Sequence, residues 1–369
     1  MDETELADVV DQVRALVEAH YIFPEAAAKV SAVLAAGLAD RRYPAGLPAL
    51  ATAVTADLQS VNGDKHLRLE YHEEAIPPRA PGDDTGEYAA MARWADQTCG
   101  GVACAQRLAG NVGYLDLRPV LFPAVLCGEV ITAAMSLLAT ADALIIDLRN
   151  CLGGEPGMVA FIISYLWDRD PAQLSGVRER RDNLLRQTWT LPYVPGRRFG
   201  KDKPVYVLTS AVTFSGGEQL SYDLQQLGRA TIVGEPTRGG AHLREGFRIH
   251  PHLEATISVA AAINPKTGGN WEGTGVAPDI QTTADQARDT AYERALRDII
   301  TAGGTAAAEA RDALPAAPPP PPGPNKHNRE AAAACQPRSS AASQVTAQLA
   351  AAALKVSAWP SWVDDELWT

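Results

Sequence analysis

The sequence predicts an α/β protein: a mixed β-sheet core flanked by helices, with a small N-terminal three-helix domain and a C-terminal tail. Three observations predict this class. Apolar residues follow helical spacing from residue 5 to residue 60, and strand-like runs then alternate with helix-like runs as far as residue 300. After Thr301 the composition shifts to alanine and proline. The 369 residues are 46% hydrophobic and 21% charged, which is enough apolar material for a sizeable core.

The N-terminal region is predicted to be a helical bundle domain over residues 1–62. Its first helix places six apolar residues on one face: Leu6, Val9, Val10, Val13, Leu16 and Val17. Helical spacing repeats over residues 26–38 and 47–58, with Pro24 and Pro44 near the breaks. We therefore expect three helices here.

Residues 63–300 are predicted to form the α/β core. The run 143–148 is continuously apolar apart from one aspartate, as expected for a strand buried on both faces between layers of helices. The other expected strands are 66–72, 112–117, 204–210, 230–235, 247–249 and 255–260. The expected helices are 125–139, 158–166, 216–227 and 285–300.

Residues 301–369 are predicted to be a linker and a tail. The proline run at 316–324 favours an extended chain. Beyond it, Trp359, Trp362 and Trp368 make the end of the chain unusually apolar, so we expect this tail to dock on protein surface.

Charge and cysteine content exclude several classes of function. A net charge of −11, with the acidic residues scattered, argues against a nucleic-acid groove. No CxxC pair occurs, so no zinc framework is indicated, and we expect neither a metal nor a cofactor. Cys99 and Cys104 could form a disulfide in an oxidising compartment, the alternative being free thiols.

The first residues lack both the basic and the apolar region of a secretory signal. No run of the chain reaches the roughly 18 apolar residues that a membrane span requires. The expected location is therefore the cytoplasm, or outside the cell if a leader has been trimmed away.

The stretch Thr213-Phe214-Ser215-Gly216-Gly217-Glu218 puts a serine where a strand is expected to turn into a helix. Such a turn exposes the hydroxyl at the sheet edge, and the N–H of Gly216 with the helix N-terminus favours a nearby oxyanion. The other interpretation is that Ser215 caps the helix, with Glu218 completing a capping box.

Three further stretches favour catalysis. Asp64-Lys65-His66 is a turn that delivers a histidine to the start of a strand. Gly153-Gly154 follows the buried strand and offers a second oxyanion N–H. Asn270-Trp271-Glu272-Gly273 supplies a carboxylate. Individually, His66 could be an ordinary strand-end histidine and Glu272 a surface loop residue.

Together and in this order, these four blocks resemble the S41-type serine peptidases, the tail-specific or C-terminal processing protease family. The similarity is greater to the branch without a PDZ domain, which includes the tricorn protease core and the interphotoreceptor retinoid-binding protein repeats. It covers roughly residues 5–300. The resemblance implies the crotonase/ClpP-like ββα superhelix as the fold of the core.

The resemblance also implies a catalytic triad of Ser215 as nucleophile, His66 as general base and Glu272 as the acid that orients the base. It implies an oxyanion hole from the N–H groups of Gly216 and of Gly153 or Gly154. Substrate contacts are expected from the following residues: Phe214, Gly239, Gly240 and His242. For His242 the alternative is that it only packs a turn. One departure matters, because glycine stands in the turn after the strand 230–235 where C-terminal processing proteases carry a lysine base.

The predicted function is therefore a serine peptidase or hydrolase acting on a peptide or peptide-like substrate through an acyl-enzyme. The alternative is a non-catalytic protein on the same scaffold that binds apolar ligands or peptide C-termini. The tail, with its acidic cluster at 364–366, resembles such a ligand, so self-binding or homo-oligomer formation are further expectations.

Overall fold

The structure is a computed structural model that describes residues 1–78, 85–168 and 170–314. The expectations for the proline linker and the tryptophan-containing tail lie outside the described residues. None of the helices in the described ranges is long and apolar enough to cross a membrane.

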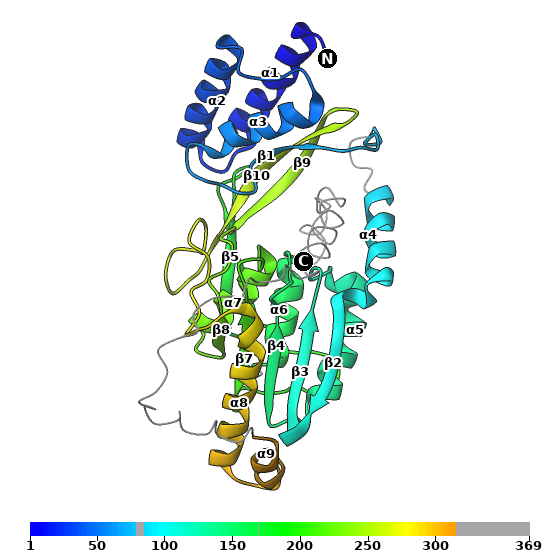
Figure 1. Ribbon diagram of the computed structural model, residues 1–369, viewed down its shortest axis with the longest axis vertical. Helices are drawn as coiled ribbons and strands as arrows, with labels where there is room; N and C mark the ends of the chain where they lie inside the picture. The colour runs from blue at the N-terminus through cyan, green and yellow to red at the C-terminus, as the bar shows by residue number, and fades with distance from the viewer. Residues whose placement is uncertain (79–84, 169, 315–369) are drawn as a thin grey trace, which may run out of the picture.

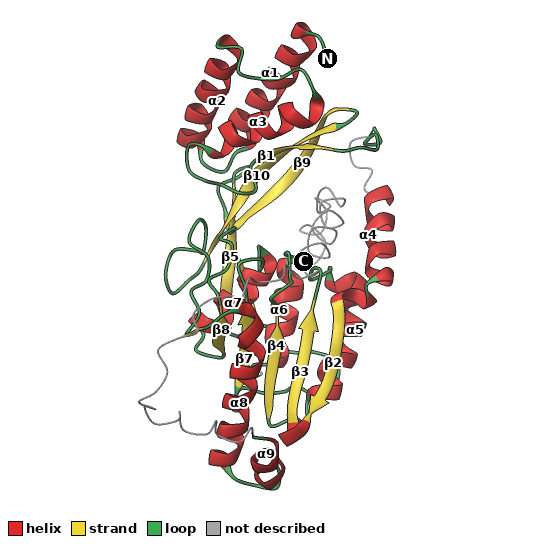
Figure 2. Cartoon of the chain, viewed as in Figure 1, coloured by secondary structure: helices red, strands yellow, loops and turns green. Residues whose placement is uncertain are grey.

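The helices are α1 (Glu3–His20), α2 (Pro24–Ala39), α3 (Leu47–Gln59), α4 (Thr85–Gln97), α5 (Ala124–Leu138), α6 (Pro156–Tyr165), α7 (Gly216–Gln226), α8 (Ala284–Ala302) and α9 (Ala307–Ala313). The strands are β1 (Arg68–Tyr71), β2 (Val102–Leu108), β3 (Val112–Leu117), β4 (Ala143–Asp147), β5 (Gln173–Glu179), β6 (Leu185–Trp189), β7 (Val205–Thr209), β8 (Thr231–Gly234), β9 (His242–His250), β10 (Leu253–Ile263) and β11 (Ile280–Gln281). Figure 2 colours the two kinds of element separately.

One sheet has the order β11-β8-β7-β4-β3-β2 and is parallel except for the antiparallel pair β2–β3. Its central strand β4 is buried throughout, which confirms the prediction for this run. Leu144 and Ile146 pack into the core formed with α5 and α6, whereas Ala143 and Ile145 pack against α8. The sheet is therefore the middle layer of three.

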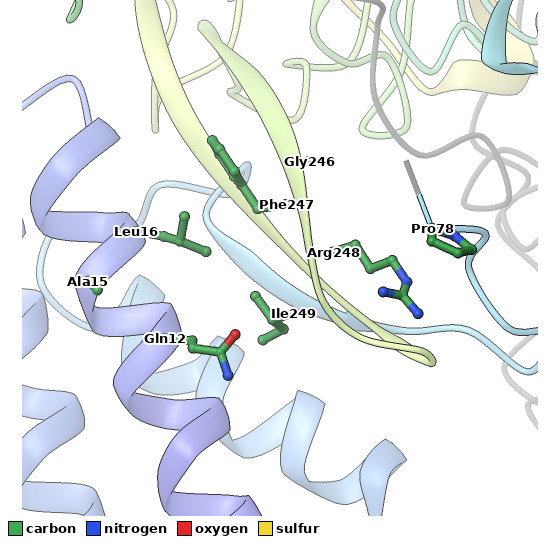
Figure 3. Close-up of a pocket in the computed structure, with 8 residues that line it drawn as sticks. All are labelled: Gln12, Ala15, Leu16, Pro78, Gly246, Phe247, Arg248 and Ile249. Carbon is green, nitrogen blue, oxygen red and sulfur yellow. The ribbon is translucent and has the colours of Figure 1, made fainter. Parts of the chain in front are cut away.

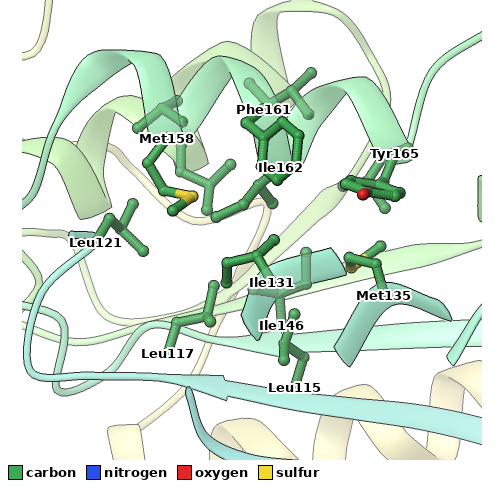
Figure 4. Close-up of a cluster of buried hydrophobic side chains, with 14 of the residues drawn as sticks. Leu115, Leu117, Leu121, Ile131, Met135, Ile146, Met158, Phe161, Ile162 and Tyr165 are labelled. Atoms are coloured by element: carbon green, nitrogen blue, oxygen red, sulfur yellow. The ribbon is translucent and has the colours of Figure 1, made fainter. Parts of the chain in front are cut away.

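The core between this sheet and helices α5 and α6 is dense in large apolar side chains (Figure 4). Ile131 and Met135 of α5 and Phe161 of α6 are among those that lie over the strands. Burying each side chain of this size stabilises the fold by roughly 1.5–3 kcal/mol. The cluster fixes β4, and with it the loop that leaves the carboxyl end of β4.

The second sheet is built around the long strand β10, which pairs with β1, β9 and β5, while β6 pairs with β5. Helices α1 to α3 cover it at the N-terminal end of the molecule (Figure 1). Their apolar faces share one core with Leu69, Leu253 and Ala255. The three predicted helices are thus present, and the exact domain division at residues 62 and 300 stays a prediction.

The predicted fold class is confirmed, with the strands divided between two sheets instead of one. Elements α4, β2, β5, β6, β11 and α9 have no counterpart in the sequence analysis. Strands β2 and β5 alternate poorly between buried and exposed positions and carry several exposed or half-exposed polar residues, which weakens the period-two signal. Cys99 and Cys104 are free thiols, so the disulfide considered above is not formed.

Candidate active site

Ser215 stands at the sharp turn between β7 and α7. Its backbone has φ +48° and ψ −118°, a conformation that costs a residue with a Cβ roughly 1–3 kcal/mol. The side chain is half-buried. The serine therefore lies beyond the carboxyl end of a strand of the parallel sheet, and its role as the nucleophile stays a prediction.

The glycine loop after β4 packs directly on this turn. A Cβ built on Gly153 would lie 3.3 Å from the Cβ of Ser215 and 3.9 Å from the amide nitrogen of Gly216. Two hydrogen bonds tie the segments together: Thr213 Oγ1 donates to Leu148 O at 2.8 Å, and Phe214 N donates to Cys151 O at 3.0 Å. The parallel strands β4 and β7 therefore bring the predicted oxyanion glycines beside the serine.

Glu218 fastens the serine turn to a second loop. Its carboxylate accepts from the backbone N–H of Ser215 (2.9 Å), Gly239 (2.6 Å) and Gly240 (2.8 Å), and from the hydroxyl of Thr237 (2.5 Å). Glu218 is fully buried, and burial raises its pKa to about 7 in spite of these donors. The capping and catalytic interpretations are thus compatible, because the cap rigidifies the same turn.

His66 lies in the turn before β1, buried, and its ring stacks on Phe214 with centroids 4.7 Å apart. Its backbone is held at both ends: the N–H donates to Asp64 Oδ1 (2.9 Å) and the carbonyl accepts from Thr256 Oγ1 (2.7 Å). Burial, reinforced by nearby cations, lowers the pKa of His66 to about 3. The imidazole is therefore neutral at neutral pH, and no hydrogen bond to its Nδ1 is formed within the described residues.

Glu272 contacts a different histidine. Its Oε2 accepts from Ala241 N at 2.6 Å and lies 3.5 Å from Nδ1 of His242, while Oε1 is buried without a partner among the described residues. Burial raises the pKa of Glu272, although the charge of His242 opposes this. It is mostly buried, so it is not a surface loop residue.

Asp64 joins the two histidines. It is wholly buried, and its Oδ2 accepts from His242 Nδ1 (2.7 Å) and from the hydroxyl of Tyr21 (3.0 Å). Burial would raise the pKa of Asp64, but the hydrogen bond and charge of His242 outweigh it and lower the value to about 2. The pKa of His242 is raised, since Asp64 and Glu272 overcome the effect of burial.

Within the described ranges, no hydrogen bond joins Ser215 to His66 or His66 to Glu272. The predicted triad therefore stays a prediction, with its members gathered around Phe214 and Asp64. The expected substrate contacts are all buried: Phe214, Gly239, Gly240 and His242. Their role also stays a prediction.

Two important residues were missed by the sequence analysis. Asp64 could have been found from its position two residues before His66, where an aspartate side chain commonly caps the N–H of a turn. Tyr21 gives no such signal, since its contact with Asp64 spans 43 residues.

Asp64, His242 and Glu272 also place one possible metal ligand atom each within 4.8 Å of one another. Protein donors already occupy both oxygens of Asp64, so internal hydrogen bonding accounts for the cluster. A cavity of about 530 Å³ lies elsewhere, between α1 and β9 (Figure 3). None of the predicted site residues lines this cavity. Its lining consists of Gln12, Ala15, Leu16, Pro78, Gly246, Phe247, Arg248 and Ile249.

Two family models match the chain. Peptidase family S41 matches residues 111–282, and the N-terminal domain of Peptidase_S41 in eukaryotic IRBP matches residues 3–98. The first match contains Ser215, Glu272 and the predicted oxyanion glycines at 153–154 and 216. The second contains Asp64 and His66.

A carboxyl-terminal-processing protease from Synechocystis sp. is 29% identical over 215 residues, which is 56% of this chain and 47% of that protein. The chain thus spans about half the length of this curated relative. Among solved structures, mature CPAF has a TM-score of 0.54 at 12% identity, covering 82% of this chain and 99% of that one. The tricorn protease has a TM-score of 0.52 at 14% identity, covering 80% and 37%. These likenesses establish the fold.

Proposed function

Since the chain belongs to peptidase family S41, we propose that it is a serine hydrolase that cleaves peptide or peptide-like bonds through an acyl-enzyme on Ser215. The observation that carries the proposal is the strained turn at Ser215, packed against the glycine loop 153–154. Strain of this kind persists where surrounding structure enforces it, and it is common at catalytic nucleophiles.

In the proposed reaction, Ser215 Oγ attacks the substrate carbonyl carbon while His66 accepts the hydroxyl proton. The N–H of Gly216, with that of Gly153 or Gly154, stabilises the oxyanion. The protonated histidine then gives its proton to the leaving amine, and a water molecule activated by the same histidine releases the acyl group. The family resemblance assigns the orientation of this base to Glu272.

The surroundings of Gly240 support histidine as the base. A Cβ built at this position would lie 2.2 Å from the ring of Phe214 and 2.7 Å from Cε1 of His66. A side chain here and the His66 ring therefore exclude each other. This agrees with the branch of the family that lacks a lysine in the turn after the strand 230–235 and uses a histidine from elsewhere in the chain as the base.

A serine-reactive fluorophosphonate probe tests the proposal. The wild-type protein is expected to be labelled at Ser215, as mapped by mass spectrometry of the modified peptide. The Ser215→Ala variant should lose at least about 10³-fold in labelling rate, because the substitution removes the attacking hydroxyl. Absence of labelling in folded wild-type protein would contradict the proposal.

One observation favours the alternative of a non-catalytic binding protein for apolar ligands or peptide C-termini. His66 stacks on Phe214 instead of bonding Ser215, and its buried ring is a weak base because of its lowered pKa. Equilibrium binding of apolar C-terminal peptides by both wild-type protein and Ser215→Ala, with no turnover by either, would support this alternative.

A further inference from the structure

We propose that Asp64, and not Glu272, is the carboxylate that positions His66 for proton transfer, and that His242 connects Glu272 to Asp64. The catalytic consequence rests on the proposed function, whereas the hydrogen-bonding arrangement stands independently of it. Asp64 is a positioning residue in this scheme, since it acts through the imidazole.

The first argument is where the two oxygens of Asp64 lie. Oδ1 already accepts the backbone N–H of His66 at 2.9 Å and lies 4.0 Å from Nδ1 of the same residue. Oδ2 is taken by His242 and Tyr21. One oxygen of Asp64 is therefore held beside the base, at a distance that a small rotation of the imidazole closes to a hydrogen bond.

The second argument is the state of His66 itself. Its Nδ1 is buried and has no partner in the described part of the chain. A buried polar atom of this kind costs roughly 1–3 kcal/mol until it is paired. A histidine base needs Nδ1–H held by an acceptor so that Nε2 is free to take the serine proton. Asp64 Oδ1 is the carboxylate oxygen recorded near this atom.

The third argument is the position of Glu272. Its polar contacts are with the N–H of Ala241, just before β9, and with His242, the first residue of β9, and not with His66. His242 lies between the two carboxylates, with Nδ1 2.7 Å from Asp64 and 3.5 Å from Glu272. We infer that Glu272 influences the base indirectly, through His242. The histidine in turn holds Asp64 in place and keeps it ionised.

Several charged groups near His66 affect how readily its imidazole accepts a proton. Asp64 stabilises a positive imidazolium, whereas Arg68, Arg244 and His242 oppose it. Asp64 is thus the group that can offset the positive charge gained by His66 when it accepts a proton.

The experiment compares Asp64→Asn with Glu272→Gln in the full chain, by the rate of fluorophosphonate labelling at pH 6, 7 and 8. Asp64→Asn should lower the rate on the order of 10²–10³-fold, equally at the three pH values, because burial keeps His66 neutral throughout. Glu272→Gln should cost less than about 10-fold. A large loss in Glu272→Gln with a small one in Asp64→Asn would overturn the proposal.

A matched control is Asp57→Asn, which removes another carboxylate that accepts from a tyrosine hydroxyl (Tyr43 Oη to Asp57 Oδ2, 2.6 Å) and whose ion pair is with Arg42, outside the proposed site. Its labelling rate should stay within about twofold of wild type. Circular dichroism shows whether each variant is folded.

A second readout does not depend on activity. ¹⁵N NMR of the histidine rings should place the proton of His66 on Nδ1 in the wild type and in Glu272→Gln, and give a tautomer mixture in Asp64→Asn. An unprotonated Nδ1 in the wild type, or the same tautomer in Asp64→Asn, contradicts the proposal. If Ser215 is never labelled, the proposed function fails, and the tautomer measurement still decides the role of Asp64.

Discussion

The two halves of the candidate site differ in how completely their polar groups are satisfied. On the nucleophile side, Glu218 accepts four hydrogen bonds and ties the Ser215 turn to the loop 237–240. On the base side, His66 Nδ1 and Glu272 Oε1 are buried without partners among the described residues. The polar groups on the nucleophile side are therefore hydrogen-bonded, whereas two buried polar atoms on the base side have no hydrogen-bond partner among the described residues.

This difference indicates how the protein would work. A rigid oxyanion half is useful, because donors that need no reorganisation stabilise the developing charge most. Unpaired buried groups on the other half favour a rearrangement that pairs them. We expect the serine turn to stay in place when a peptide binds, while the His66 ring turns from Phe214 toward Asp64 and Ser215.

The largest effect is expected from adding a methyl group to the rigid half, in Gly154→Ala. Gly154 has φ +143°, and a Cβ here would lie 2.4–2.6 Å from the Cβ, O and N atoms of Leu121. The substitution should destabilise the protein by about 3 kcal/mol and lower the rate of labelling at Ser215 on the order of 10³-fold. Denaturant unfolding and probe labelling measure the two effects.

A tolerated methyl group at Gly154, with labelling within about threefold of wild type, would show that the glycine loop is not a rigid part of the site. Gly269→Ala is the matched control, because a Cβ there would meet only Thr267 Oγ1 at 4.0 Å. We expect its stability to change by less than about 0.5 kcal/mol.

The next effect tests the mobile half. Gly240→Ala places a methyl group where the rings of Phe214 and His66 lie. Because side chains can move aside more easily than backbone, we expect a stability loss of about 1–2 kcal/mol, smaller than at Gly154. Labelling should fall on the order of 10²-fold, since the imidazole is displaced. An increase in labelling would indicate that Phe214 holds His66 in an inactive position.

Sequence reasoning reached the features of the site that depend on local pattern. The turn at Ser215 follows from Gly216 and Gly217 after a β-rich run, and the turn at His66 from its place before a strand. The buried strand β4 was found because its apolar run is continuous, and the glycine loop that follows it packs on Ser215.

The contacts that decide the chemistry were out of reach, because they join distant parts of the chain. His242 bonds Asp64 across 178 residues, and only the pairing of β1 and β9 with β10 brings these segments together. Glu272 was assigned to His66 by resemblance, whereas the turn that carries it ends beside His242. Which side chains become partners here depends on tertiary packing and not on spacing along the chain.

The last expected effect concerns the pH dependence of stability, and it isolates the buried base. Burial lowers the pKa of His66 from 6.5 to about 3, so the folded protein disfavours the proton that the unfolded chain accepts. This contribution to stability is complete above pH 6.5 and is lost progressively as the pH falls toward 3.

The variant His66→Phe keeps a ring that can stack on Phe214 and removes the titrating imidazole. Between pH 7 and pH 5 the wild type should therefore lose about 2 kcal/mol more than the variant in denaturant unfolding. The other ionisable groups, including His242 with its raised pKa, are common to both proteins and cancel in the difference. Parallel curves over this range would mean that His66 is already paired or solvated, and that the two halves of the site do not differ as described.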